Sequence, residues 1–322
     1  MILSQDLAKK IRYIQIYTNK AVNDILAGEY QSVFKGSGME FDEVREYIPG
    51  DEIRTIDWNV TARMNKPYVK RYREERELTL MLVVDISASG IFSTTQQSKN
   101  EYIAQLSALL AFTATKNNDK VGLILFSDKV HKYIPPQKGT THVLKIIREV
   151  LTHRPPVPQK TTKTWWKKIL FTLLPWIQRD TIQPLQTDIA CALDYLAHIQ
   201  KRRAVVFLIS DFQSMEYETA IRTTAKRHDL IAIPITDPRE KELPNVGILT
   251  LQDAETGQQI TIDTSSSQVR TQYKLQQQQK QQELQHQWNT YQIDHIDLQT
   301  DQEPTNSIIH FFQNRRMRNA MI

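Results

Sequence analysis

Cysteine and glycine are both scarce in this sequence. One cysteine, Cys191, occurs among 322 residues, which excludes a disulfide framework and a zinc site made of several thiolates within this sequence. Nine glycines are present, and none forms a Walker-type phosphate loop; the HExxH and GxSxG motifs are missing too. The common signatures of nucleotide hydrolases, zinc proteases and serine hydrolases are therefore absent. The single thiol favours a reducing compartment, and we expect a cytoplasmic protein.

Long apolar runs and a strong excess of one charge are also missing. No run of about 18 apolar residues occurs, so we expect no helix to span a bilayer. Residues 1–6 become polar too early for a signal peptide. The net charge of +5 comes from 41 basic and 36 acidic residues. This mild excess does not indicate a nucleic-acid partner, because nucleic-acid-binding domains concentrate basic charge more strongly.

The middle of the chain alternates apolar runs with helical patterns. Continuous apolar runs are typical of strands buried on both faces, and they occur at 80–84, 121–126, 204–209 and 230–235. Helical spacing occurs at 98–116, 140–152, 188–200 and 216–228. Strands separated by helices of this length imply right-handed crossovers. The sequence therefore predicts an α/β fold with a doubly wound, mostly parallel sheet flanked by helices, and a short edge strand at 130–134.

The two ends of the chain add smaller elements. We expect one amphipathic helix over 5–27 that ends near Gly28, and then short strands and turns over 36–78, where glycines and a Pro-Gly turn exclude long periodic elements. After the sheet we expect a hairpin, a Gln-rich polar surface helix, a last strand and a last helix, at 246–262, 266–288, 291–297 and 304–317. We divide the chain into an N-terminal helix and short-strand extension, 1–77, and a main domain, 78–322.

Polar side chains follow several of the predicted strands directly. Asp85 begins an Asp-x-Ser-x-Ser sequence, and Asp211 ends the third long strand. In open α/β sheets, ligands bind beyond the carboxyl ends of the strands. A carboxylate and two hydroxyls from one loop are hard oxygen ligands, which suit Mg²⁺, Mn²⁺ or Ca²⁺. The alternative for Asp85 is a structural role as a helix cap or in an Asx-turn.

This set of residues resembles the metal-ion-dependent adhesion site of von Willebrand factor A domains, whose pattern is Asp-x-Ser-x-Ser, then Thr, then Asp. The match falls on Asp85, Ser87, Ser89, Thr187 and Asp211. The resemblance implies a von Willebrand factor A-like fold and a bound Mg²⁺, Mn²⁺ or Ca²⁺. It also implies an open coordination position that accepts a carboxylate from a protein partner. We interpret Asp188 as a helix cap.

A second resemblance lies before the sheet. The block FDEVREYIPGD at 41–51, with Thr61-Ala62-Arg63 and the segment 68–77, resembles the signature of the bacterial domain of unknown function 58 family. The resemblance covers about 30–235 and extends loosely to 293–301 and Phe311-Phe312. It implies a non-enzymatic adaptor, often encoded beside MoxR-type AAA+ ATPases, that works with such an ATPase in the assembly or maturation of other proteins.

Residues 154–186 interrupt the α/β pattern. From Arg154 to Arg179 there are six basic residues and no acidic one, and three of the five tryptophans lie here. One interpretation is an interfacial helix on an anionic membrane, which would make the protein peripheral to the inner membrane. Its contacts would come from Trp165, Trp166, Lys167, Lys168 and Trp176. The other interpretation is a helix that packs against the protein itself or a partner.

Two other functions remain as alternatives. A haloacid-dehalogenase-like phosphotransferase or hydrolase would use Asp85 as its nucleophile, but it needs a second carboxylate two residues later, where this chain has Ser87. A nucleic-acid binder would use the basic insert, but the chain has no groove-reading motif. Cys191, between two alanines, is predicted to be a small core residue.

Overall fold

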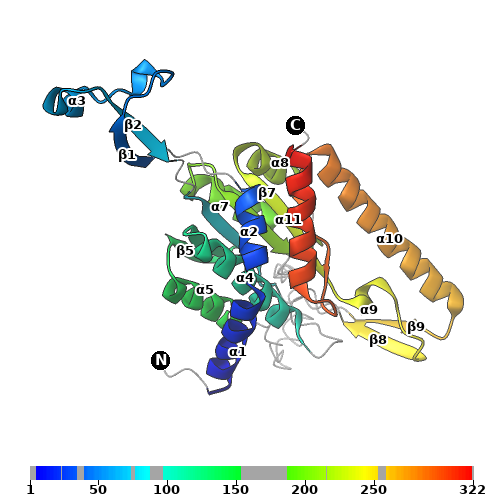
Figure 1. Cartoon of the computed structure of the whole chain (residues 1–322). Helices are drawn as coiled ribbons and strands as arrows, with labels where there is room; N and C mark the ends of the chain where they lie inside the picture. The colour runs from blue at the N-terminus through cyan, green and yellow to red at the C-terminus, as the bar shows by residue number, and fades with distance from the viewer. Residues whose placement is uncertain are drawn as a thin grey trace, which may run out of the picture.

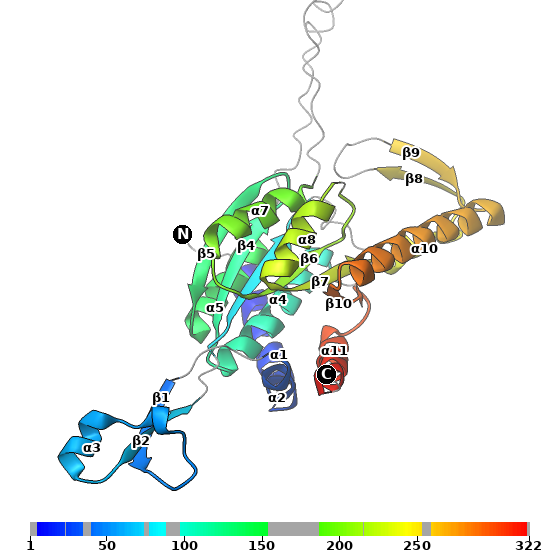
Figure 2. The same ribbon diagram turned by 90° about the horizontal axis from the view of Figure 1, so that it is seen from above.

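The protein is a layered α/β molecule with a smaller unit near its N-terminus (Figure 1). The computed structural model describes residues 5–22, 24–34, 40–73, 77–87, 97–153, 187–214, 216–252 and 259–320. The main body is a sheet of seven strands with helices on both faces (Figure 2). This arrangement confirms the predicted fold class, a mostly parallel sheet flanked by helices.

The sheet has the strand order β10-β7-β6-β3-β4-β5, with β11 also paired to β7. Its strands are β3 (Thr79–Asp85), β4 (Lys120–Phe126), β5 (Val130–Gln137), β6 (Val205–Ser210), β7 (Asp229–Thr236), β10 (Asp294–His295) and β11 (Leu298–Gln299). Every pairing is parallel except that of β5, which lies antiparallel to β4 at the edge. The carboxyl ends of β3, β4 and β6 therefore meet at one edge of the sheet.

Alternate residues of the strands face two separate core layers. In β3, Leu80, Leu82 and Val84 face one layer, and Met81 and Val83 face the other. The first layer is covered by α1 (Gln5–Ala21), α2 (Asp24–Val33), α4 (Lys99–Lys116), α5 (Thr140–Thr152) and α11 (Pro304–Ala320). The second is covered by α7 (Ile189–Ile199), α8 (Glu218–Arg227) and the end of α10 (Ser267–Thr290). Burial on both faces explains the continuous apolar runs of the strands.

The single N-terminal helix predicted over 5–27 is wrong, because the structure has two helices there. The last turn of α1 closes with a hydrogen bond from the Val22 N–H to the Thr18 carbonyl oxygen, and α2 begins at Asp24. The second helix continues past Gly28, and its Tyr30 ring packs against Phe312 of α11 with 5.8 Å between ring centroids. A straight helix cannot follow both contact surfaces, so the chain changes direction. Both helices share a core with the sheet, and the division at residue 77 stays a prediction.

The small unit holds the block with the family signature. It contains β1 (Glu40–Glu46), the 3₁₀ turn η1 (Ile53–Thr55), α3 (Trp58–Met64) and β2 (Tyr68–Arg73). The two strands are antiparallel, and the unit extends away from the sheet in both views (Figures 1 and 2). Arg45 donates to both carboxylate oxygens of Asp51, at 2.9 and 2.7 Å. This pair fixes the turn that contains Pro49-Gly50, which gives the signature block a structural role.

The C-terminal third supplies a long polar helix and a hairpin. The hairpin strands are β8 (Ile248–Gln252) and β9 (Gln259–Asp263), and the short helix α9 (Pro238–Lys241) precedes them. Among the residues of α10, only Trp288 is buried, which confirms the predicted polar surface helix. The last strand, predicted over 291–297, is instead the two short strands β10 and β11, because the pairing with β7 is interrupted at Ile296 and Asp297. No helix in the described ranges combines the length and the apolar character needed to cross a bilayer.

Candidate functional site

Asp85 is the last residue of the central strand β3 and lies between the ends of β6 and β4. Its side chain is 5% exposed. One carboxylate oxygen, Oδ1, accepts a hydrogen bond from the Ser87 N–H at 2.8 Å. The other, Oδ2, accepts from the Ser210 hydroxyl at 2.7 Å. The backbone of the loop and the neighbouring strand thus hold this carboxylate in one orientation at the sheet edge.

The electrostatics of this position are unfavourable for a negative charge. Burial raises the pKa of Asp85 to about 7, and the negative charge of Asp211 contributes to the rise. The hydrogen bonds from Ser210 and Ser87 act in the opposite direction because they stabilise the charged form. Two acidic side chains therefore lie near each other in a place that is poorly solvated.

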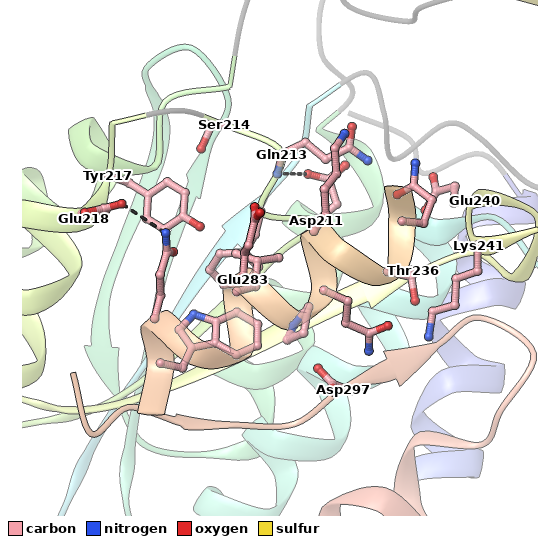
Figure 3. Close-up of a pocket in the computed structure, with 18 of the residues that line it drawn as sticks. Asp211, Gln213, Ser214, Tyr217, Glu218, Thr236, Glu240, Lys241, Glu283 and Asp297 are labelled. Carbon is pink, nitrogen blue, oxygen red and sulfur yellow. Dashed lines mark hydrogen bonds between the residues drawn. The ribbon is translucent and has the colours of Figure 1, made fainter. Parts of the chain in front are cut away.

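Asp211 follows β6 in a tight turn. Its Oδ1 accepts a hydrogen bond from the Gln213 N–H at 3.2 Å, drawn as a dashed line between the two labelled residues in Figure 3. Phe212 has a left-handed backbone, with φ +54°, and its N–H donates to the Ser210 hydroxyl at 3.2 Å. Within the described residues, the Asp211 Oδ2 is buried and has no hydrogen-bond partner. Nearly all buried polar atoms of native proteins are paired, so this oxygen is a candidate to bind a cation.

Thr187 and Asp188 reach the same edge through a backbone contact. The Asp188 N–H donates to the Ser127 carbonyl at 2.7 Å, and Ser127 directly follows the β4 residue that pairs with Asp85. The Asp188 side chain accepts from the Cys191 N–H at 2.9 Å, which confirms its role as a helix cap. Thr187 is 7% exposed. Cys191 is only half-buried, so its predicted place in the core is wrong; the buried face of α7 carries Ala192, Leu193 and Leu196 instead.

The structure thus brings part of the predicted ligand set together. At the ends of β3 and β6, Asp85 accepts from the Ser87 N–H and lies within reach of the charge of Asp211, and Thr187 precedes the residue that contacts Ser127 after β4. Ser89 and the whole insert 154–186, with its tryptophans, lie outside the described residues. Ser210-Asp211 ends the third long strand in the sequence, but sequence reasoning did not predict the hydrogen bond of Ser210 to Asp85 on the neighbouring strand. Its signal was available, because a serine that ends a strand next to a strand ending in Asp is placed for such a hydrogen bond.

A second polar cluster, Ser127, Asp128 and His131, lies at the end of β4. The Ser127 hydroxyl donates to Asp128 Oδ1 at 2.8 Å and lies 2.6 Å from His131 Nε2. Asp128 Oδ1 is 3.4 Å from the same nitrogen. In a Ser-His-Asp triad the serine and the carboxylate contact different ring nitrogens. The cluster therefore lacks the geometry of an activated serine, and the sequence carried no spacing that would have revealed it.

The residues at the edge fit a hard divalent cation by their chemistry. No group of three or more His, Cys, Asp or Glu side chains in the described ranges is arranged to hold a metal ion. The edge instead offers two carboxylates and the hydroxyls of Ser87 and Thr187, which are oxygen donors of the kind that Mg²⁺ accepts together with water. The unpartnered Asp211 oxygen fits such an ion. The assignment of these side chains as ligands stays a prediction.

Comparison with known proteins identifies relatives over most of the chain. A family model described as a protein of unknown function, DUF58, matches residues 43–283. Protein Rv1480 of Mycobacterium tuberculosis is 31% identical over 252 residues, which cover 78% of this chain and 72% of that protein. Protein YeaD of Bacillus subtilis is 27% identical over 107 residues, or 33% of this chain and 25% of that protein.

Solved structures resemble this one only distantly. BatB from Bacteroides thetaiotaomicron has a TM-score of 0.44 and 16% identity, and the match covers 74% of this chain and 99% of that one. The von Willebrand factor A domain of SpRpn10 has a TM-score of 0.28 and 15% identity, over 49% of this chain and 75% of that one. At these values the likenesses bear on neither the site nor the activity.

Proposed function

The chain belongs to the DUF58 family, and we propose that it is a non-enzymatic protein-interaction module that depends on a divalent cation, Mg²⁺ before Mn²⁺ or Ca²⁺. The residues that would hold the ion are Asp85, Ser87, Ser89, Thr187 and Asp211. The bound ion would supply an open coordination position for a carboxylate of the partner. The observation that carries the proposal is the buried oxygen of Asp211, which has no partner in the described residues and lies near the buried carboxylate of Asp85.

The physical argument starts from the two carboxylates. Burial disfavours the charged form of Asp85, and the negative charge of Asp211 adds to that cost. A divalent cation reverses this balance, because it makes both negative charges favourable. Neutral hydroxyls and waters would fill much of the coordination shell, and exchange of one water would open a position for a carboxylate from the partner. The role of the chain's own residues is to hold these oxygens at the rim of a rigid sheet.

The partner that we propose is a MoxR-type AAA+ ATPase, with the chain acting as an adaptor in the assembly or maturation of other proteins. The family resemblance supports this partner. A peripheral membrane contact through the insert 154–186 is the companion proposal for localisation; it falls outside the described residues and is supported by the basic and aromatic sequence there.

The metal proposal is tested by thermal unfolding with and without MgCl₂. At about 100 times the dissociation constant, a ligand that binds only the folded state stabilises it by about 2.7 kcal/mol. An unfolding entropy of about 2.1 cal/mol/K per residue converts this, for 322 residues, into a rise in Tm of about 4 °C. We expect this rise in the wild type and its loss in Asp211→Asn, which removes one charge without changing the shape of the side chain.

The matched control is Asp188→Asn at the same edge. Asparagine caps a helix about as well as aspartate, so this variant keeps the Cys191 N–H contact and the Mg²⁺-dependent rise in Tm. An equal rise in Asp211→Asn and in the wild type would overturn the ligand assignment. The partner proposal has its own assay, a pull-down of the ATPase with and without EDTA, in which capture that is insensitive to both EDTA and Asp211→Asn would refute metal-dependent recognition.

A further inference from the structure

A pocket opens beside Asp211, on the side of the sheet covered by α10. It has a volume of about 510 Å³, within the usual range for sites that enclose a ligand. Figure 3 shows the side chains around it, which come from the loop after β6, from α9 and from α10. We call it the α10 pocket. Because Asp211 belongs both to its wall and to the candidate metal edge, the two features are continuous.

The floor of the α10 pocket is aromatic and apolar. Trp288 and Leu284 of α10 meet Phe212 and Tyr217 of the loop after β6 there. The Trp288 and Phe212 rings pack edge to face with 5.4 Å between their centroids. Flat apolar surfaces of this kind accept the aliphatic stem of a long side chain or a segment of peptide backbone.

The rim of the pocket is acidic, although the whole chain carries a net charge of +5. Two lysines line the pocket together with six carboxylates, those of Asp211, Glu216, Glu218, Glu240, Glu283 and Asp297. Glu240 is neutralised by the buried Lys99 at 2.6 Å. Glu216 and Glu283 are exposed and form no ion pair within the described residues. The rim therefore attracts cations and repels phosphates and nucleic acids.

Two buried polar atoms in the lining lack partners. Trp288 is 2% exposed and Ser214 is 9% exposed, and neither the indole N–H nor the serine hydroxyl has a hydrogen-bond partner in the described residues. Native proteins satisfy nearly all such groups. An indole N–H needs an acceptor, and the carbonyl oxygen of a peptide backbone provides one. This observation is independent of the acidic rim, and a water molecule or a bound ligand would account for it.

We propose that the α10 pocket binds a basic segment of a partner protein, with an Arg or Lys side chain over the aromatic floor and its charged end at Glu216 and Glu283. Charge complementarity selects this occupant, because the floor fits an aliphatic stem and the rim fits a cation. Because the pocket shares Asp211 with the candidate metal edge, the bound segment would lie next to the partner carboxylate that binds the candidate metal. This last point alone rests on the proposed function. The partner would then present an acidic residue and a basic one close together in its sequence.

The experiment measures fluorescence anisotropy of a labelled Gly-Arg-Leu-Arg-Gly peptide on the full chain in EDTA, with Gly-Glu-Leu-Glu-Gly as the charge-reversed probe. We expect binding of the basic peptide only, weakening as salt is added. The double variant Glu216→Gln/Glu283→Gln should bind about four- to 25-fold more weakly, since each exposed charge pair contributes a factor of about two to five. Glu52→Gln, an exposed carboxylate on the small unit, is the matched control and should bind like the wild type.

The results separate this proposal from that of the metal. The double variant should keep the Mg²⁺-dependent rise in Tm, while Asp211→Asn loses it. Equal binding of the two peptides, or equal affinity of the double variant and the wild type, would overturn the basic-segment proposal and leave the metal proposal standing. If the wild type shows no Mg²⁺-dependent rise in Tm but still binds the basic peptide, the metal proposal alone is overturned. In the metal-bound protein, an aspartate added to the basic peptide should tighten binding, and this gain should vanish in EDTA.

Discussion

Replacing Asp85 by asparagine in the metal-free protein should change how stability depends on pH. The folded-state pKa of Asp85 is raised to about 7, first by burial and then by Asp211, whereas an aspartate in the unfolded chain titrates near 3.9. Between these two values the folded state binds more protons than the unfolded state. The free energy of unfolding therefore falls as pH rises through this window, and it levels off above about pH 7. The stabilisation is fully present only below the unfolded pKa.

The magnitude follows from the width of the window. Each unit of pKa difference is worth about 1.36 kcal/mol, so a window of about three units costs the wild type about 4 kcal/mol by neutral pH. The asparagine side chain of the variant has no charge to lose, and it keeps the acceptor for the Ser87 N–H. The Ser210 hydroxyl, which donates to Oδ2 in the wild type, can accept from the new amide instead.

The assay is urea unfolding of both proteins in EDTA at intervals from pH 4.5 to 8. Contributions from groups that do not interact with Asp85, such as Asp119 with its pKa raised to about 6 by burial, are common to both proteins and cancel in the difference. As the pH rises to about 7, the free energy of unfolding of the variant should increase relative to that of the wild type by up to about 1.4 kcal/mol per pH unit. Parallel curves would refute the reasoning. Saturating Mg²⁺ should remove the difference in slope, because a cation favours the charged carboxylate.

Two further predictions test the packing and the absence of enzymatic activity. Gly122→Ala should destabilise the fold by about 1–3 kcal/mol, because a Cβ would lie 2.6 Å from the Met81 sulfur and 3.1 Å from Pro136 Cγ. In contrast, a Cβ on Gly28 in α2 would meet nothing within 4 Å, so Gly28→Ala should stabilise the fold by about 0.5–1 kcal/mol. Urea midpoints in the reverse order would contradict this account of the packing. A chromogenic phosphate ester should not be hydrolysed with or without Mg²⁺, since Ser87 stands where a phosphotransferase needs its second carboxylate; turnover that disappears in Asp85→Asn would favour the enzyme alternative.

Local patterns in the sequence were sufficient for most of the main sheet. The continuous apolar runs predicted β3, β4, β6 and β7 to within one residue or so, because strands buried on both faces tolerate few polar side chains. The same patterns predicted which side chains end at the carboxyl edge. Asp85 and Asp211 were found in this way, since the rule that parallel strands end together needs no knowledge of contacts.

The N-terminal helices and the last strand show where local patterns fail. The apolar spacing continues across the break between α1 and α2, whereas the packing of Tyr30 and Phe34 against Phe312 of α11 explains the change of direction. Strands β10 and β11 are two residues each, too short to leave a periodic signal. Their position is decided by pairing with β7, which lies about sixty residues earlier in the chain.

By itself, the sequence determined the layered α/β fold, the edge at which acidic side chains gather and the polar character of α10. Tertiary structure alone decided that Ser210 holds Asp85, that Asp211 keeps an oxygen without a partner in the described residues, and that Trp288 closes the floor of an acidic pocket against Phe212. The physical reason is that periodicity reports which face of an element is buried, whereas hydrogen bonds and pockets depend on which elements, distant in sequence, pack together.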